Sequence, residues 1–176
     1  MAQMIPYMKQ VGDSVGIKFE YGGKTGNTRD SHRLIEEAGH KGLELQDKLV
    51  NALFHSYFEV NEDITDHDVL ARIAAEVGLF ESKDEALEFL KSDKRGPEVD
   101  KEVEFNQYRR GISGVPHFII EGSISGSRQS DITGEIEVGG AQETRVFENI
   151  FSQLEKYLKD EPQIEGDVCL PDGSNC

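Results

Sequence analysis

The two cysteines of this chain, Cys169 and Cys176, carry its most nucleophilic side chains. Six residues separate them, and the Pro-Asp-Gly within that stretch is typical of a turn, so the thiols could close a disulfide. In the chain-entropy model a loop this short gains roughly 2.5 kcal/mol from the cross-link. The alternative is a pair of reduced thiols without a role, the usual state inside cells. Asp167 and Asp172 favour that alternative, because neighbouring carboxylates raise a thiol pKa and leave less thiolate.

The other side chains that bind metals or nucleotides do not form a recognisable motif. Asp63, Asp66 and Asp68 lack the glycine and the terminal glutamate of a calcium loop. The sequence has no phosphate-binding loop, no dinucleotide fingerprint and no Gly-x-Ser-x-Gly elbow. We therefore expect no metal and no nucleotide. The histidines show no metal-ligand spacing with the cysteines; they are His32, His40, His55, His67 and His117.

The chain is strongly acidic, with 34 acidic and 19 basic residues among 176 and a net charge of −15. This charge argues against binding to nucleic acid or to an anionic membrane. Residues 59–104 alone hold 15 acidic against six basic residues, which indicates either solvated helix faces or an acidic docking surface. No apolar run is long enough for a membrane span, and the first residues lack the features of a signal peptide. We expect a soluble, cytoplasmic protein.

Helical periodicity dominates the middle of the chain. Asn27 or Thr28 can cap the first helix, for which Gly39 offers a stop. Ser82 and Glu85 have the spacing of a capping box at the start of a later helix. Apolar residues recur at helical spacing throughout this part. The signals predict five helices joined by short loops, at about 27–39, 45–58, 66–78, 82–90 and 97–110.

Strand signals lie outside this helical block. Residues Ile17–Tyr21 alternate apolar and polar side chains, which predicts a strand. A second strand is expected at about 115–120, with 135–138 as its hairpin partner across a loop too long for a tight turn. A last helix follows at about 146–158, and the acidic residues from 162 onward predict a loose tail. The first eight residues look like one face of an apolar helix that begins without a cap.

Five runs of residues, in the same order along the chain, resemble the DsbA-like thioredoxin superfamily in its FrnE-type branch. They are similar to the family patterns N-T-x-x-A-H-R-L, L-F-x-A-Y-F, D-I-x-D-x-x-V-L, G-V-x-G-V-P-x-F and G-A-Q. The resemblance spans roughly residues 1–158. The runs that carry it are Asn27–Leu34, Leu53–Phe58, Asp63–Leu70, Gly111–Phe118 and Gly140–Gln142.

The resemblance implies an α/β fold, namely an incomplete thioredoxin-like fold that keeps its closing β-β-α part and holds a large all-helical insertion. Residues 1–26 would be the remnant of the connection into the insertion, 27–110 the insertion, 111–160 the β-β-α half, and 161–176 a flexible acidic tail. The family's first β-α-β unit carries its Cys-x-x-Cys motif, which this chain lacks. That unit would lie upstream, so we expect an N-terminally truncated member of the family.

The resemblance also implies a substrate platform at Val115 and Pro116, the position of the family's cis-proline loop. In the family, the backbone of the residue before this proline pairs with an extended peptide or with glutathione. The alternative is an ordinary trans bond that opens a strand, since few X-Pro bonds in folded proteins are cis.

Two further sets of candidate residues follow from the same resemblance. Glutathione-using members of the superfamily have an asparagine near this point that touches the ligand, so Asn27 and His32 are candidate substrate-binding residues. Their alternative role is structural, as a helix cap and a helical histidine. FrnE-type members often carry a cysteine pair near the C-terminus, which gives Cys169 and Cys176 a hypothetical accessory redox role.

Three functions remain open. The first is a DsbA-like thiol-disulfide oxidoreductase that lacks its Cys-x-x-Cys unit but retains the cis-proline platform. The others are a glutathione-dependent isomerase or transferase of the same superfamily and a non-catalytic binding module. Because thiol exchange needs an activated thiolate, we expect no catalytic residue and no activity from this chain alone. We expect no cofactor, a thiol or disulfide peptide or glutathione as partner, and self-association through a sheet face left exposed by the missing strands.

Overall fold

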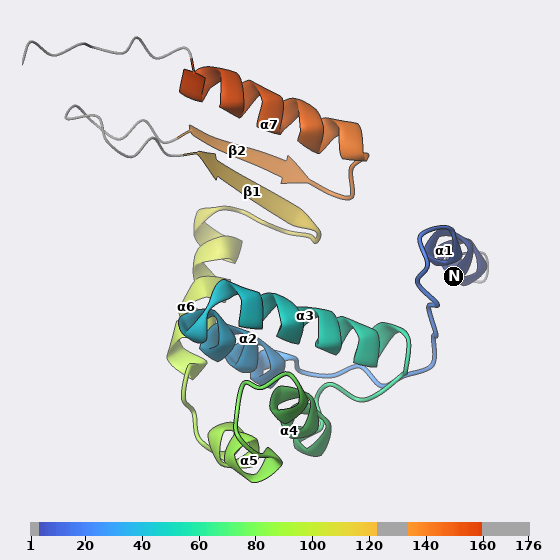
Figure 1. Cartoon of the computed structure of the whole chain (residues 1–176), viewed down its shortest axis with the longest axis vertical. Coiled ribbons are helices and arrows are strands. Elements are labelled where there is room, and N and C mark those ends of the chain that lie inside the picture. The colour runs from blue at the N-terminus through green and yellow to red at the C-terminus, as the bar shows by residue number, and fades with distance from the viewer. Residues whose placement is uncertain (1–3, 123–133, 160–176) are drawn as a thin grey trace, which may run out of the picture. The chain divides into compact units, whose positions relative to one another are not determined.

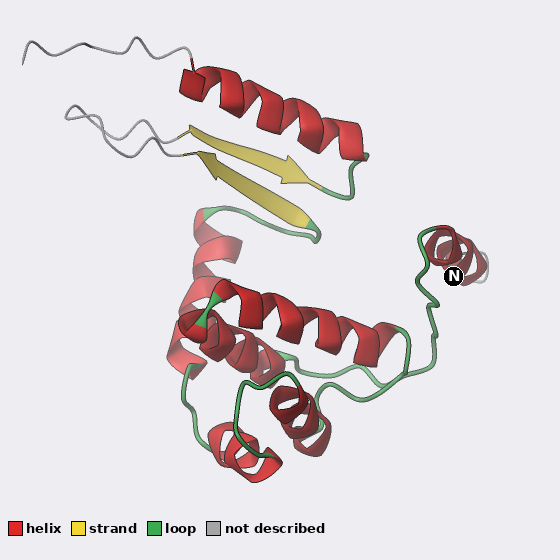
Figure 2. Cartoon of the chain, in the orientation of Figure 1, coloured by secondary structure: helices red, strands yellow, loops and turns green. Residues whose placement is uncertain are grey.

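The computed structural model describes residues 4–122 and 134–159. The chain divides into two compact units, Met1–Gly111 and Ile112–Cys176 (Figure 1). The described part of the first unit is helical, and that of the second holds a small sheet and one helix (Figure 2). The fold is therefore mixed α/β and mostly helical, as predicted. Among the described residues, no helix has the length and apolar character that a membrane crossing needs.

The first unit contains the five helices predicted between residues 27 and 110, and a further helix precedes them. The last of the five continues into a short π-helix, η1, so that the helical path reaches Arg109, close to the predicted end. The elements are α1 (Met4–Ser14), α2 (Arg29–Lys41), α3 (Leu43–Phe58), α4 (His67–Glu76), α5 (Lys83–Lys91), α6 (Gly96–Glu104) and η1 (Phe105–Arg109).

Local capping explains where these helices begin. The Asp66 carboxylate accepts the backbone N–H of Asp68 at 2.7 Å and starts α4. The Ser82 hydroxyl accepts the N–H of Glu85 at 3.2 Å, as a capping box requires. The reciprocal bond differs from that motif, because the Glu85 carboxylate accepts the N–H of Glu81 instead of that of Ser82.

The predicted stop at Gly39 is wrong, since α2 continues to Lys41 and ends at Gly42, whose φ is +145°. Gly39 leaves room for the Gln46 side chain of α3. A Cβ at that position would lie 2.7 Å from Nε2 of Gln46, so a side chain there would require the flexible end of Gln46 to move.

The core of the first unit joins the inward faces of α2 to α5. Leu34, Leu49 and Leu70 are fully buried, one from each of three helices. Each buried leucine contributes about 1.5–3 kcal/mol through the hydrophobic effect. The other fully or almost fully buried apolar residues of this cluster are Ala38, Leu53, Ala71, Ile73, Ala74, Leu79, Phe80, Ala86, Phe89 and Leu90.

Residues Ile17–Tyr21 do not form the strand that their alternation predicts. The segment is extended but has no neighbouring strand among the described residues. Its backbone completes the end of α3, because the N–H of Glu20 donates to the Phe58 carbonyl oxygen at 2.8 Å. The Phe19 ring packs against Phe58 with the centroids 5.8 Å apart. The alternating pattern thus reflects contact with a helix end.

The second unit pairs β1 (His117–Gly122) with β2 (Gly134–Gly139) in an antiparallel ladder, and α7 (Thr144–Lys159) covers one face (Figure 1). The hairpin partner and the last helix are confirmed. Phe118 faces α7 and meets Phe147 with ring centroids 4.9 Å apart. The predicted long loop between the strands and the acidic tail from 162 onward fall on residues 123–133 and 160–176, which lie outside the described residues.

Candidate functional site

A groove of about 410 Å³ lies in the helical unit, between the start of α2 and the stretch formed by α6 and η1. It brings together the two candidate residues Asn27 and His32, as their spacing at the start of one helix predicts. Arg29 and Tyr108 lie on opposite walls. The residues that line the groove are Asn27, Thr28, Arg29, His32, Val99, Asp100, Val103, Glu104, Gln107 and Tyr108.

Asn27 and Thr28 share the capping of α2. Thr28 occupies the N-cap position, but its hydroxyl makes no capping bond. The Asn27 carboxamide oxygen accepts the backbone N–H of Arg29 at 2.9 Å instead. The Thr28 carbonyl oxygen in turn accepts the hydroxyl of Ser31 at 2.7 Å. The Asn27 oxygen is therefore held in place, and its amide N–H₂ remains as a donor that a ligand in the groove can use.

The imidazole of His32 has a defined tautomer when it is neutral. Its Nδ1 lies 2.8 Å from the carbonyl oxygen of Thr28, one turn earlier on the helix. Because a carbonyl oxygen only accepts hydrogen bonds, Nδ1 carries the proton and Nε2 is the acceptor. His32 is exposed and lines the groove, so it can accept an N–H or O–H from a ligand. No cysteine lines the groove, so the ring has no thiol to activate there.

Arg29 fixes the position of α6 relative to α2. Its Nε and one terminal nitrogen donate to the two carboxylate oxygens of Asp100, at 2.7 and 2.9 Å, and the other terminal nitrogen donates to Asp93 at 2.8 Å. The hydrogen bond to Arg29 lowers the pKa of Asp100, and the same bonds raise the pKa of Arg29. Gly96 packs directly beneath this pair, where a Cβ would collide with the guanidinium and with Asp93.

The opposite wall carries one stripe along the helix, with the carboxylates of Asp100 and Glu104 beside it. Val99, Val103 and Gln107 are spaced four residues apart and continue from α6 into η1. Val99 is buried, Val103 is half exposed, and Tyr108 is 79% exposed. None of the predicted site residues lies on this wall. The stripe itself was the available signal, but nothing in it indicated that α6 would pack beside the start of α2.

The chemistry of the groove favours neutral or weakly cationic polar groups over anions. Arg29 is balanced by Asp93 and Asp100, and Glu104 adds a further carboxylate. The amides of Asn27 and Gln107 and the acceptor nitrogen of His32 suit peptide-like N–H and C=O groups.

A buried arginine anchors α2 below the groove. Arg33 is 2% exposed, and its guanidinium donates to the carbonyl oxygens that follow α5 and close its end. The bonds to Ser92 and Lys94 measure 2.6 and 2.9 Å, and those to Phe89 and Leu90 measure 3.2 and 3.4 Å. These carbonyl groups lie in the last turn of α5 and in the loop that follows it, where a helix end leaves carbonyl oxygens in need of partners. Arg33 thus ties α2 to the segment that leads into α6.

Two carboxylates complete this buried network. Asp30 accepts Arg33 at 2.7 Å and pairs with Nε2 of His67 at 2.6 Å. Burial alone would raise the pKa of Asp30, but these two hydrogen bonds outweigh it and leave the pKa below its ordinary value. Glu37 behaves in the same way, since the bonds from Lys94 and Arg95 overcome the effect of burial and lower its pKa.

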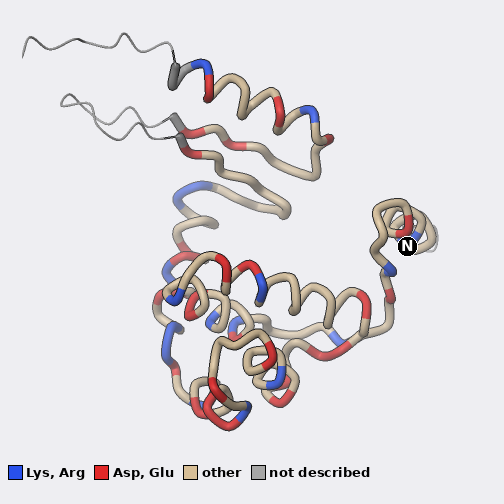
Figure 3. Tube along the Cα trace, in the orientation of Figure 1, with Lys and Arg blue, Asp and Glu red and all other residues tan. Residues whose placement is uncertain are grey.

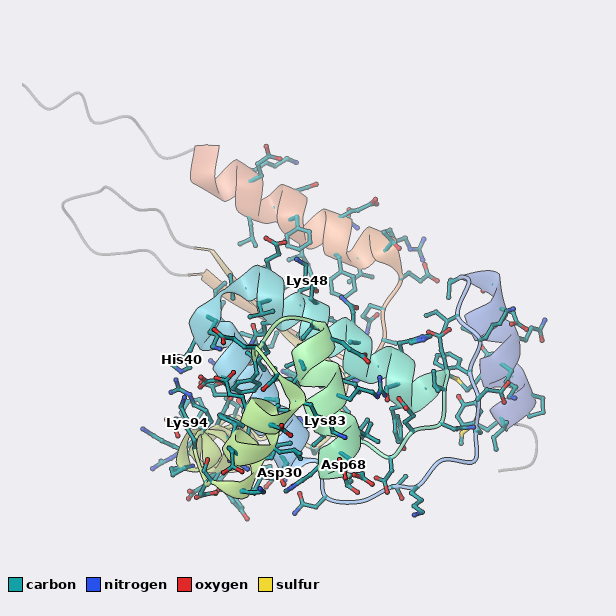
Figure 4. The ribbon with its side chains drawn as sticks, turned by 60° about the horizontal axis from the view of Figure 1, so that its bottom comes forward. Asp30, His40, Lys48, Asp68, Lys83 and Lys94 are labelled. Atoms are coloured by element: carbon teal, nitrogen blue, oxygen red, sulfur yellow. The ribbon has the colours of Figure 1, made fainter. Side chains whose placement is uncertain are left out.

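The acidic stretch 59–104 carries basic partners on its own surface. Figure 3 shows Lys and Arg interspersed among the Asp and Glu of the helical unit. Figure 4 shows Asp68 and Lys83, from α4 and α5, whose charged groups lie 2.6 Å apart. Arg72 bridges Glu62 and Glu76. Within the part of the chain that the structure describes, no three His, Cys, Asp or Glu side chains are grouped to hold a metal ion.

The loop before β1 holds the other predicted site. The Val115–Pro116 peptide bond is cis, as the resemblance implies. The Val115 side chain is 92% exposed, and its backbone N–H and C=O make no hydrogen bond among the described residues. The Pro116 carbonyl oxygen accepts the N–H of Gly140 at 2.8 Å, and Gln142 donates to the Gly139 carbonyl oxygen at 2.9 Å. The loop is therefore held on one side and open on the other.

The predicted site residues thus fall into separate groups. Asn27 and His32 share the groove of the first unit, whereas Val115 and Pro116 belong to the second unit. The proposed redox pair, Cys169 and Cys176, lies outside the described residues.

Comparison with known proteins identifies the family. A model of the DSBA-like thioredoxin domain matches residues 1–151, which is most of the chain. A search of curated proteins returned no match. The mixed α/β structure, with a helical unit ahead of a β-β-α unit, is consistent with a DsbA-like thioredoxin fold that holds a helical insertion. This chain therefore belongs to the DSBA-like thioredoxin domain family.

Proposed function

We propose that this chain is the substrate-binding part of a DsbA-like thiol-disulfide oxidoreductase of the FrnE-type branch, with the loop Ile112–Pro116 as its peptide platform. Membership in the family supports a thiol-disulfide activity. One observation at Val115 carries the proposal. Its backbone N–H and C=O have no hydrogen-bond partner among the described residues, and the residue is exposed. An extended peptide can pair with such a backbone as an added strand does.

The chemistry of this role is divided between binding and exchange. In thiol-disulfide exchange a thiolate attacks one sulfur of a disulfide, forms a mixed disulfide and expels the other sulfur as a thiolate. Val115 would hold the peptide extended while that attack occurs. The 176 residues contain no Cys-x-x-Cys to supply the attacking thiolate. We therefore propose that they bind a thiol or disulfide peptide without turning it over.

Binding of a labelled cysteine peptide, with its thiol S-methylated, tests the platform by fluorescence anisotropy. The substitution Val115→Glu should weaken binding at least about tenfold, because it places a charge that must be desolvated beside the paired backbone. Val115→Thr, which keeps the shape and the backbone, should bind like the parent chain. Val15→Glu adds the same charge at another exposed valine and should have no effect. Equal affinities for all three variants would contradict the platform.

A second function is favoured by one observation, the shared groove of Asn27 and His32. If the chain is instead a glutathione-dependent isomerase or transferase of the superfamily, glutathione should bind and Asn27→Ala should abolish that binding. The excess of carboxylates around the groove argues against an anionic tripeptide. Binding of the cysteine peptide that is insensitive to glutathione would support the first function. If the chain binds neither the cysteine peptide nor glutathione, the non-catalytic binding module is the function that remains.

Turnover is the separate test of the exchange step. In an insulin-reduction assay the chain should show no activity above the uncatalysed rate. Activity that survives Cys169→Ser combined with Cys176→Ser would contradict the proposal, since no other cysteine exists.

A further inference from the structure

The groove between α2 and the stretch formed by α6 and η1 contains polar groups that the fold does not use. Arg29 and Asp100 hold each other, and the Nδ1 of His32 is bound within its own helix. Because the other polar side chains share one groove of about 410 Å³, they are available to a ligand. Those that make no hydrogen bond and no ion pair within the described residues include Glu104, Gln107 and Tyr108.

A π-helical turn places two of these side chains. The N–H of Arg110 donates at 3.1 Å to the carbonyl oxygen of Phe105, five residues earlier, which is the bond of a π-helix. Along an α-helix, each step of four residues overshoots a full turn by about 40°. The wider π turn opposes this drift, so Gln107 and Tyr108 line the groove together with residues of α6. Single π turns are rare and frequently mark functional sites.

The unused groups act mainly as hydrogen-bond acceptors. The Glu104 carboxylate only accepts, and the Gln107 carbonyl oxygen and the Tyr108 hydroxyl oxygen can accept as well. His32 adds the unprotonated Nε2 of its neutral ring, because its Nδ1 donates to a carbonyl oxygen. A ligand that meets several of these groups together must therefore supply several donors.

The groove also carries an excess of negative charge. Arg29 is the positively charged residue among the described lining residues, and Asp93 and Asp100 already bind it at 2.8 and 2.7 Å. Glu104 then adds a carboxylate that has no basic partner in the described part of the chain. Because opposite charge attracts a ligand and like charge excludes it, the ligand should be a cation with several N–H groups.

We propose that this groove binds an arginine side chain of a partner peptide, at a site that does not depend on the platform at Val115. A guanidinium has five N–H donors and no acceptor, and its planar fork pairs with a carboxylate such as Glu104 through two parallel bonds. It also stacks on aromatic rings, and Tyr108 is 79% exposed. The aliphatic stem can lie along Val103, which is half exposed. A lysine keeps the charge but lacks the planar fork.

Nuclear magnetic resonance titration of the full chain with a blocked alanine peptide, which has one central arginine and no cysteine, tests the site. The backbone amides of the groove, from Asn27 to His32 and from Val103 to Tyr108, should shift saturably. The same peptide with citrulline keeps the shape of arginine without its charge and should bind at least about threefold more weakly. The lysine peptide should also bind more weakly than the arginine peptide.

Two variants within the groove and one outside it identify the residues responsible. Glu104→Gln should weaken binding of the arginine peptide at least about threefold, and Tyr108→Ala at least about twofold through loss of stacking. The matched control is Glu102→Gln, an equal change of charge at an exposed residue of the same helix that does not line the groove. It should bind like the parent chain. Because all three positions are exposed, far-ultraviolet circular dichroism should match the parent chain for every variant.

The outcomes also separate this site from the platform. Val115→Glu should bind the arginine peptide in the groove no more weakly than the parent chain does, even where it loses the cysteine peptide. Equal binding of the arginine and citrulline peptides, lysine binding as tightly as arginine, or equal weakening by Glu104→Gln and Glu102→Gln would each overturn the proposal. The absence of shifts in the groove would overturn it as well.

Discussion

Arg33 should be the side chain on which the helical unit most depends, and its replacement by methionine measures this. Methionine fills much of the same space but donates no hydrogen bond. The change leaves the carbonyl oxygens of Phe89, Leu90, Ser92 and Lys94 without the guanidinium and leaves Asp30 with His67 alone. Because Arg33 is 2% exposed, water replaces these bonds poorly.

The expected loss follows from the burial of the ion pair. Removing one partner of a buried, hydrogen-bonded charge pair costs about 3–5 kcal/mol. A domain of this size has about 5–15 kcal/mol of stability in total. At about 4–8 °C per kcal/mol for a unit of roughly a hundred residues, the melting temperature should fall by roughly 12 °C or more.

Urea denaturation followed by far-ultraviolet circular dichroism measures the free energy of unfolding, since the chain has no tryptophan. The matched control is Arg29→Met on the same helix. Arg29 also bonds two aspartates, but its side chain is 30% exposed, so solvent can replace these bonds and its loss should cost clearly less than the loss of Arg33. Equal losses for the two variants would refute the reasoning, because it assigns the difference to burial.

Three further predictions concern the same unit. The lowered pKa values of Asp30 and Glu37 contribute stability that is present above their ordinary pKa values of 3.8 and 4.5 and is lost as pH falls below them. The urea midpoint should therefore drop between pH 5 and pH 3. Asp30→Asn combined with Glu37→Gln should make that drop smaller, and an unchanged drop would contradict the assignment to these two carboxylates. Gly96→Ala should destabilise the unit and broaden the amide signals of the groove, because a Cβ collides with Arg29; a melting temperature equal to that of the parent chain would count against the close packing. Asp66→Ala should cost about 1 kcal/mol through loss of the α4 cap, whereas Asp66→Asn should cost little, and equal losses would show that the cap is not responsible.

The helices could be predicted from the sequence because their signals are local. The caps at Asp66 and Ser82 and the apolar stripes act within one or two turns. Ile17–Tyr21 shows the limit of this reasoning. Its alternation is real, but a strand needs a partner, and its contact partner among the described residues is the end of α3.

For the candidate site too, one part could be predicted from local sequence and another part could not. Asn27 and His32 lie one turn apart on the same helix start, so their proximity was predictable. Tyr108 lies more than seventy residues further on, and its place on the opposite wall depends on the packing of α6 beside α2. The burial of Arg33 was equally hidden, because its acceptors come from a loop whose position only the fold determines.

Nuclear magnetic resonance titration of the full chain with the S-methylated cysteine peptide tests the proposed platform most directly. We predict saturable shifts of the backbone amides of Gly114, Val115 and His117, which lie at or next to the cis bond, and the loss of these shifts in Val115→Glu. Shifts confined to Asn27, His32 and the other groove residues would contradict it, as would the absence of any shift at saturating peptide.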